Sequence, residues 1–173
     1  MRQRIQTALE EILEASIRFT CADFGNIQLY NPAEKVLRLS VMRGFDETFC
    51  DTFGVVGTDD NTARGRSIRT GARVVIEDVG KDSGYAPYRK TAAAADYRAV
   101  QSTPLRDRQG RLLGVSSTHW RKLHRPTEQD LRMLDLYARQ AMDCIARTQA
   151  GDALRESQAK LCATPPPAQP AAP

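Results

Sequence analysis

The sequence predicts an α+β fold in which a largely antiparallel β-sheet is flanked by helices. Two segments alternate polar and apolar residues on both sides of a short turn, which is the pattern of β-hairpins, and an amphipathic helix stands at each end of the chain. Because the strands come in hairpins, antiparallel pairing is expected. The 173 residues, 41% hydrophobic and 27% charged, suffice for one domain with a sizeable core and a terminal extension.

The first helix and the first hairpin are predicted from the spacing of apolar residues, which changes from helical spacing to alternation. Apolar residues at helical spacing predict an amphipathic helix over residues 3–20. Alternation of apolar residues then predicts strands on both sides of the turn "NPAEK". Gly25, Ile27 and Leu29 suit the helix-covered side of the sheet, so the residues between them point to the other side.

The middle of the chain contains shorter elements. Residues 46–56 are expected to form a short helix or an irregular arm. Residues 59–71 predict a helix that Asp60 or Asn61 caps and Gly71 closes. A strand at 72–79, a loop at 80–90 and one or two helical turns at 88–97 complete this region.

The second hairpin, residues 99–120, turns at Asp107–Gly110 and carries polar side chains through its middle. Polar residues occupy 101–103 and 116–119, where a buried sheet favours Val or Ile. Two explanations remain open. The side chains line a binding pocket, or they satisfy one another across the strands.

The last helix begins after Thr127, a candidate cap with Asp130 three positions on. Its apolar seam has heptad spacing, which suits pairing with another helix as well as packing on a sheet. A second helical segment in a different phase is expected from about residue 152, and the Pro- and Ala-rich end is expected to be a disordered tail. The seam residues are Leu131, Leu134, Ala138, Ala141 and Ile145.

Several segments of the sequence resemble a GAF domain of the kind found in bacterial sensory histidine kinases. These segments are "ADFGNIQLYN", "RGF" at 43–45, "GRSIRTGARVVIEDV", "YRAVQSTPLRDRQGRLLGVSSTHW" and "HRPTEQDLRMLDLYARQAMDCI". The resemblance implies a PAS-related antiparallel sheet of five to six strands. The terminal helices would cover one face, and short helices and loops the other. It implies a GAF domain at 1–150, a connector helix at 151–162 and the tail at 163–173.

In this architecture the sheet face opposite the terminal helices forms a small-molecule pocket under a lid made by residues 57–71 and 81–96. Polar groups converging in a concave site are what such a pocket needs. For each of these residues a packing or solvated role is the alternative. The pocket candidates are Asn26, Gln28, Tyr30, Arg64, Arg66, Tyr85, Tyr88, Tyr97, Gln101, Thr103, Ser117 and His119.

The resemblance predicts a non-catalytic sensory or regulatory module, a fragment or a partner of a sensor histidine kinase or another output module. We expect a homodimer through the two terminal helices, because part of each apolar stripe must pack on the sheet and the rest needs a partner. The alternative is a stand-alone interaction or dimerisation module with a vestigial pocket. The candidate dimer residues are Ile5, Leu9, Ile12, Leu131, Leu134, Ala138, Ala141 and Ile145.

Composition argues against several other classes of partner. The net charge of +4 is spread among interleaved acids, so nucleic-acid binding is not expected. No apolar run reaches the length of a membrane span and no signal peptide is evident, which favours the cytoplasm. The four cysteines are far apart, without metal-ligand spacing, and are expected to be free thiols; no metal site is predicted.

Some GAF-fold proteins reduce free methionine sulfoxide with loop cysteines, and others attach a bilin to a cysteine. The corresponding loops here, 58–68 and 78–97, contain no cysteine, so neither the reductase activity nor a covalent chromophore is expected. A cyclic-nucleotide site is a third possibility, because Arg64 or Arg66 near a helix N-terminus could hold a phosphate. The identity of a ligand stays open.

Overall fold

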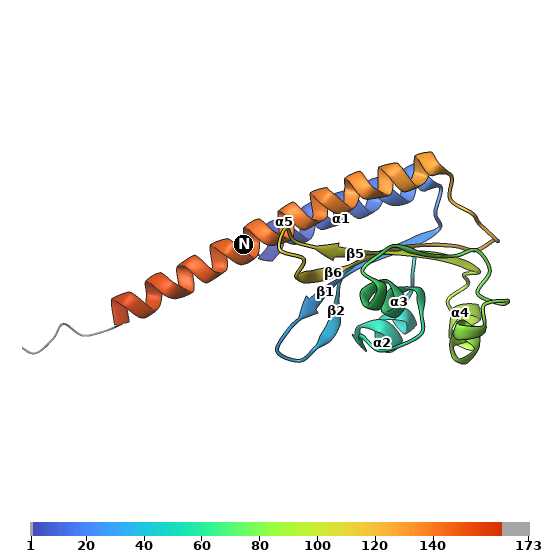
Figure 1. The fold of residues 1–173 in the computed structure, drawn as a ribbon, viewed down its shortest axis with the longest axis horizontal. Helices are drawn as coiled ribbons and strands as arrows, with labels where there is room; N and C mark the ends of the chain where they lie inside the picture. The colour runs from blue at the N-terminus through green and yellow to red at the C-terminus, as the bar shows by residue number, and fades with distance from the viewer. Residues whose placement is uncertain (1, 164–173) are drawn as a thin grey trace, which may run out of the picture.

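The computed structural model describes residues 2–163, which form a six-stranded antiparallel sheet between two layers of helices (Figure 1). The strand order β3-β2-β1-β6-β5-β4 places the two hairpins side by side through β1 and β6. The predicted α+β architecture is therefore confirmed. The strands are β1 (Phe24–Asn31), β2 (Val36–Arg43), β3 (Val55–Gly57), β4 (Val74–Ile76), β5 (Ala99–Arg106) and β6 (Leu112–Trp120).

Helices α1 (Arg2–Thr20) and α5 (Glu128–Ala163) run side by side across one face of the sheet (Figure 1). Their apolar stripes close the main core with strand residues such as Ile27, Val41 and Leu105. At Gly25 a Cβ atom would stand 2.8 Å from Leu13 Cδ1, so glycine lets α1 approach the sheet closely. The predicted assignment of Gly25 and Ile27 to this face is confirmed.

Helix α5 is one continuous helix, contrary to the expectation of a second segment from about residue 152. A single glycine costs a helix only about 1 kcal/mol, so Gly151 does not interrupt it. Thr127 and Asp130 cap its start reciprocally: Thr127 Oγ1 accepts from the Asp130 N–H and the Asp130 carboxylate accepts from the Thr127 N–H. The C-terminal part of α5 projects beyond the sheet (Figure 1).

The apolar residues of α1 and α5 that were expected to be partly exposed pack within the chain itself. Leu134, Ala138, Ala141 and Ile145 are buried, as is Leu9 of α1. Ile5, Ile12 and Leu131 are half-buried. Because the sheet and the opposing helix already cover these residues, the seam does not provide the exposed dimer surface that its spacing indicated.

Short elements cover the opposite face of the sheet: α2 (Glu47–Phe53), α3 (Ala63–Thr70), the 3₁₀ helix η1 (Ser83–Tyr88) and α4 (Arg89–Ala94). Helix α3 is capped by Thr62, whose side chain accepts from the Gly65 N–H, and not by Asp60 or Asn61. Gly71 ends it at φ 69°, as predicted for a glycine that closes a helix. The expected loop at 80–90 contains η1.

Within residues 2–163, no helix combines the length and the apolar character that crossing a bilayer requires. The predicted tail lies, apart from its first residue, outside the described residues.

Candidate functional site

A small chamber lies between the sheet and the short elements on its second face. Strands β1, β5 and β6 supply its floor, and α2, α3, η1 and the segment leading into β5 supply its walls. The chamber volume is about 10 Å³, which is room for roughly one water molecule. Its lining residues are Asn26, Phe49, Phe53, Thr62, Ala63, Arg64, Tyr85, Tyr97, Val100, Ser102, Ser117 and His119.

The polar floor is set by strand register. Asn26 lies opposite Ser117 across β1 and β6, and Ser117 lies opposite Ser102 across β6 and β5. Residues directly opposite in antiparallel strands share a face, so the three side chains form a row. The two serine hydroxyls are 2.8 Å apart and hydrogen-bonded.

His119 forms part of an aromatic wall. The rings of Phe45 and Tyr97 meet the imidazole edge-on, with centroids 5.0 and 4.8 Å away. Burial, and secondarily the Arg64 charge, lower the pKa of His119 to about 3. The imidazole is therefore neutral at physiological pH and serves as a polar ring in this wall.

Arg64, on the first turn of α3, is the charged residue of the chamber lining. Its Nη2 donates to Asp60 Oδ2 at 3.1 Å, and its Nη1 donates to Gln28 Oε1 at 3.0 Å. Gln28 in turn donates to the Phe53 carbonyl at 2.8 Å. These contacts tie α2 and α3 to β1, and the guanidinium charge is balanced by a largely buried carboxylate.

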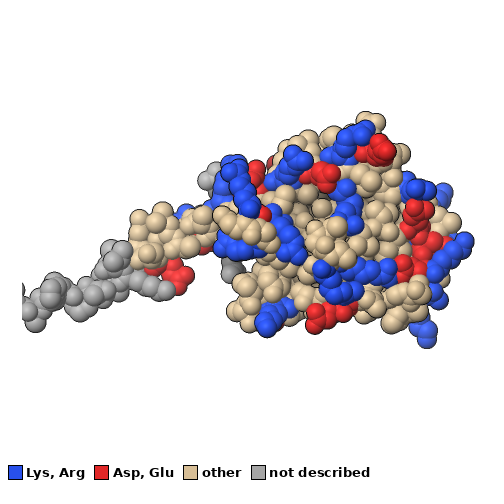
Figure 2. All heavy atoms as spheres, viewed as in Figure 1, with Lys and Arg blue, Asp and Glu red and all other residues tan. Residues whose placement is uncertain are grey.

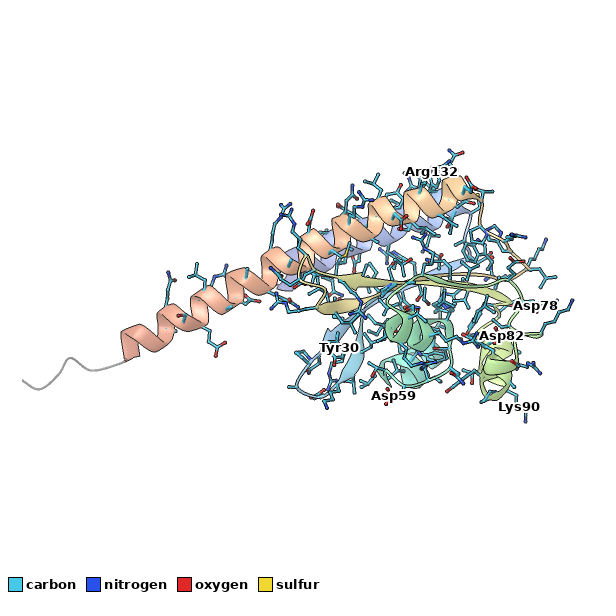
Figure 3. The ribbon with its side chains drawn as sticks, viewed as in Figure 1. Tyr30, Asp59, Asp78, Asp82, Lys90 and Arg132 are labelled. Carbon is cyan, nitrogen blue, oxygen red and sulfur yellow. The ribbon has the colours of Figure 1, made fainter. Side chains whose placement is uncertain are left out.

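Half of the predicted pocket residues line the chamber: Asn26, Arg64, Tyr85, Tyr97, Ser117 and His119. Gln28 is buried beside it and holds Arg64 in place. Tyr30 lies on the β1–β2 hairpin, outside the lining (Figure 3). Arg66 instead binds Asp82, its Nη1 2.9 Å from Oδ2, and so joins α3 to η1. Tyr88 packs edge-on against Tyr85.

Gln101 and Thr103 lie on the face opposite the chamber, so their placement in the pocket was wrong. Gln101 pairs with Thr118, whereas the chamber residue Ser117 pairs with Ser102. Next to the turn Arg106 pairs with Leu112, and a β-bulge between Leu105 and Arg106 then shifts the register, so that odd-numbered residues of β5 lie opposite even-numbered residues of β6. Gln101 and Ser117 therefore point to opposite faces.

On that opposite face the polar residues form a chain toward α5. Gln101 donates to Thr118 Oγ1 at 3.2 Å and accepts from Thr103 Oγ1 at 3.0 Å. Arg73 donates to Thr103 Oγ1 and also reaches the Leu131 carbonyl of α5. The unusual polarity of this hairpin thus serves two faces: one lines the chamber and the other connects the sheet to the terminal helix.

Six lining residues were not predicted. Phe49 and Phe53 are four residues apart on α2, a spacing that places both rings on one helix face and was a usable signal. Val100 and Ser102 follow from the strand register. Thr62 and Ala63 form the start of α3, whose cap lies one or two residues after the expected Asn61 or Asp60.

Among the described residues, no group of three or more His, Cys, Asp or Glu residues is arranged to hold a metal ion. Cys50 lies on α2 with its sulfur 3.5 Å from Met42 Sδ, outside the chamber lining. Lys and Arg gather where α5 leaves the globular body (Figure 2), but Asp107 and Asp143 lie in the same groove.

An antiparallel sheet with the terminal helices on one face and short helices over a small chamber on the other defines a three-layered α+β domain. The chain belongs to the GAF domain family, whose pattern matches residues 3–146.

The chain is also similar to individual proteins. It is 31% identical over 94 residues to the methyl sulfide methyltransferase-associated sensor of Methanosarcina acetivorans, a match that covers 54% of this chain and 9% of that protein. In structure it resembles a domain described as part of a two-component sensor histidine kinase from Sinorhizobium meliloti, with a TM-score of 0.70, 22% identity and coverage of 84% and 93% of the two chains. A type II free methionine-R-sulfoxide reductase from Thermoplasma acidophilum has the same fold, with a TM-score of 0.68, 14% identity and coverage of 84% and 95%.

Proposed function

We propose that this GAF domain is a non-catalytic sensory module. It binds a small molecule in the chamber and passes the bound state to an output partner, in a cytoplasmic setting. The observation that carries the proposal is the chamber itself, because buried polar atoms without partners are costly and are retained where a ligand or water satisfies them.

A physical connection between the chamber and α5 supports the signalling role. Arg73 follows the α3 helix that carries Arg64, and it binds both the Leu131 carbonyl and Asp135 of α5. Arg106 provides a second link. Its Nη2 donates to the Ile68 carbonyl of α3, and its backbone N–H donates to Met142 Sδ of α5. A movement of α3 on ligand binding would therefore displace α5, which is the kind of helix shift that transmits signals.

The output is proposed to be a histidine kinase or a PAS-type module, in cis or in trans, in bacterial signal transduction. The similarity to sensor proteins supports this assignment. A homodimer remains part of the proposal, now through the outer face and the projecting end of α5. Leu136 and Leu154 are 46% and 60% exposed there, and a helix end without packing gains stability from a partner.

Catalysis of the methionine sulfoxide reductase type is not favoured by the chamber. A thiolate must stand beside the bound sulfoxide, yet none of the described lining residues is a cysteine. A cyclic-nucleotide site is also disfavoured, because Arg64 and Arg66 are each bound to a carboxylate, Asp60 and Asp82. The second candidate function is an interaction module with a vestigial pocket, which the small chamber volume favours.

Native mass spectrometry of the purified protein tests both proposals together. We expect a dimer and a retained small molecule whose mass is unchanged after prolonged incubation. A dimer without any retained or added ligand would favour the interaction module, and a chemically altered ligand would indicate an enzyme. The substitution Leu154→Glu should weaken the dimer, whereas Glu156→Gln nearby should not.

A further inference from the structure

Among the residues that the structure describes, three buried polar atoms of one chamber find no hydrogen-bond partner. They are Asn26 Oδ1, Arg64 Nε and His119 Nδ1. The exposed fractions of these residues are 2%, 7% and 5%. Each unsatisfied atom of this kind costs about 1–3 kcal/mol, so the group indicates a guest that satisfies them.

The three atoms specify complementary hydrogen bonds. Arg64 Nε–H is a donor and needs an acceptor, whereas Asn26 Oδ1 is an acceptor and needs a donor. The neutral imidazole of His119 can offer either role at Nδ1. The lining also contains two hydrogen-bonded hydroxyl pairs, Tyr85–Tyr97 at 3.0 Å and Ser102–Ser117 at 2.8 Å. Within each pair one O–H group donates to the other oxygen, so the second O–H group is not used by the pair.

The chamber offers no net charge to a guest. Asp60 already balances the Arg64 guanidinium at 3.1 Å, and Gln28 occupies its Nη1. A charged guest would therefore be buried without a counter-charge, which is strongly unfavourable. The rings of Phe49, Phe53 and Tyr97 form apolar walls against which a flat molecule packs well.

We propose that the chamber receives a small, uncharged, flat molecule that presents a neighbouring acceptor and donor, as a carboxamide or lactam does. The acceptor meets Arg64 Nε–H and the donor meets Asn26 Oδ1. This inference rests on the receptor function proposed above and names its ligand class. Because the chamber has room for roughly one water molecule, side chains of α2 and α3 must move to admit such a guest.

Two isosteric series test the charge requirement: acetamide, acetate and acetamidinium, and benzamide, benzoate and benzamidinium. Binding to the full chain is followed at neutral pH by calorimetry and by NMR of the Asn26 and Arg64 side-chain N–H groups. We expect the amide to bind about tenfold or more tightly than its anionic and cationic analogues, and to shift those N–H signals.

Variants of Asn26 test the site. Asn26→Leu should weaken amide binding by about tenfold or more, whereas Gln109→Leu, which removes an exposed amide on the β5–β6 turn, should not. If Asn26→Leu does not fold, the isosteric Asn26→Asp replaces it; its added charge should turn the preference toward the amidinium.

The outcomes separate the two proposals. Anions or cations that bind as tightly as the amides would overturn the ligand class and leave the receptor function intact. Amide binding that is indifferent to Asn26 would also overturn the inference, because the amide would then occupy another site. Failure of all six compounds to bind would overturn the ligand class, and a ligand retained in native mass spectrometry would then still support the receptor function, whereas its absence would favour the interaction module.

Discussion

Arg64 Nη1 donates to Gln28 Oε1 at 3.0 Å, a buried contact between residues 36 positions apart in the chain. It joins the first turn of α3 to the central strand β1, beside the chamber. Both side chains also have a second partner, Asp60 for Arg64 and the Phe53 carbonyl for Gln28. The pair therefore ties α2 and α3 to the sheet beside the chamber.

Replacing Arg64 should weaken the attachment of α2 and α3 to the sheet. Arg64→Met leaves the Asp60 carboxylate and Gln28 Oε1 without their buried partner, so we expect a loss of about 2–3 kcal/mol in the free energy of unfolding. Urea denaturation measures it. Arg18→Met, which removes an exposed ion pair with Glu14, should change stability by less than about 0.5 kcal/mol. Equal effects of the two substitutions would contradict the structural role of Arg64.

The serine pair on the chamber floor lends itself to a double-mutant cycle. Ser102→Ala or Ser117→Ala alone leaves one buried hydroxyl without its partner and should cost about 1 kcal/mol. The double variant should be more stable than the sum of the two losses predicts, by about 1 kcal/mol, because no hydroxyl remains unpaired. Strictly additive losses in chemical denaturation would show that the two hydroxyls are not coupled.

His119 should make the folded state sensitive to mild acid. Its pKa in the folded state is about 3, below the ordinary value of 6.5, so the unfolded chain binds the extra proton first as the pH falls. The contribution of His119 to the free energy of unfolding is complete above pH 6.5. Below that pH it falls by roughly 1.4 kcal/mol per pH unit until the folded-state pKa of about 3 is reached. Asp82, whose pKa is lowered by the Arg66 hydrogen bond, contributes only below its ordinary value of 3.8. Urea midpoints between pH 6.5 and about 4.5 therefore isolate the histidine. His119→Phe should flatten this slope, and an unchanged slope in that variant would refute the assignment.

Arg73 should hold the N-terminal half of α5 on the sheet. Its Nη2 is 2.6 Å from Asp135 Oδ1, and its Nη1 is 3.2 Å from the Leu131 carbonyl. Arg73→Leu should speed amide hydrogen exchange in residues 128–138 by about fivefold, the equivalent of about 1 kcal/mol. Arg132→Leu, on the outer side of the same helix (Figure 3), should have little effect on this exchange. If both variants exchange alike, Arg73 does not couple the sheet to α5.

Much of the fold was determined by the sequence. The period of apolar residues specified the terminal helices, both hairpins and the side of β1 that faces the helices, because local periodicity reflects which face each element buries. It also placed Asn26, Ser117 and His119 in a polar site. Local turn chemistry identified Gly71 as the end of α3 and Thr127 as the cap of α5.

Long-range packing decided the rest. Which side of β5 lines the chamber depends on β6 pairing with β1, residues some ninety positions away, and so Ser102 replaced Gln101. The heptad seam of α5 could be recognised in the sequence, but it packs on the chain's own sheet and on α1. An apolar stripe shows that a helix face is buried, and it does not show which surface buries it. The contact between Arg64 and Gln28 likewise forms only once α3 folds over β1. The sequence does not indicate that two polar residues so far apart will be hydrogen-bonded.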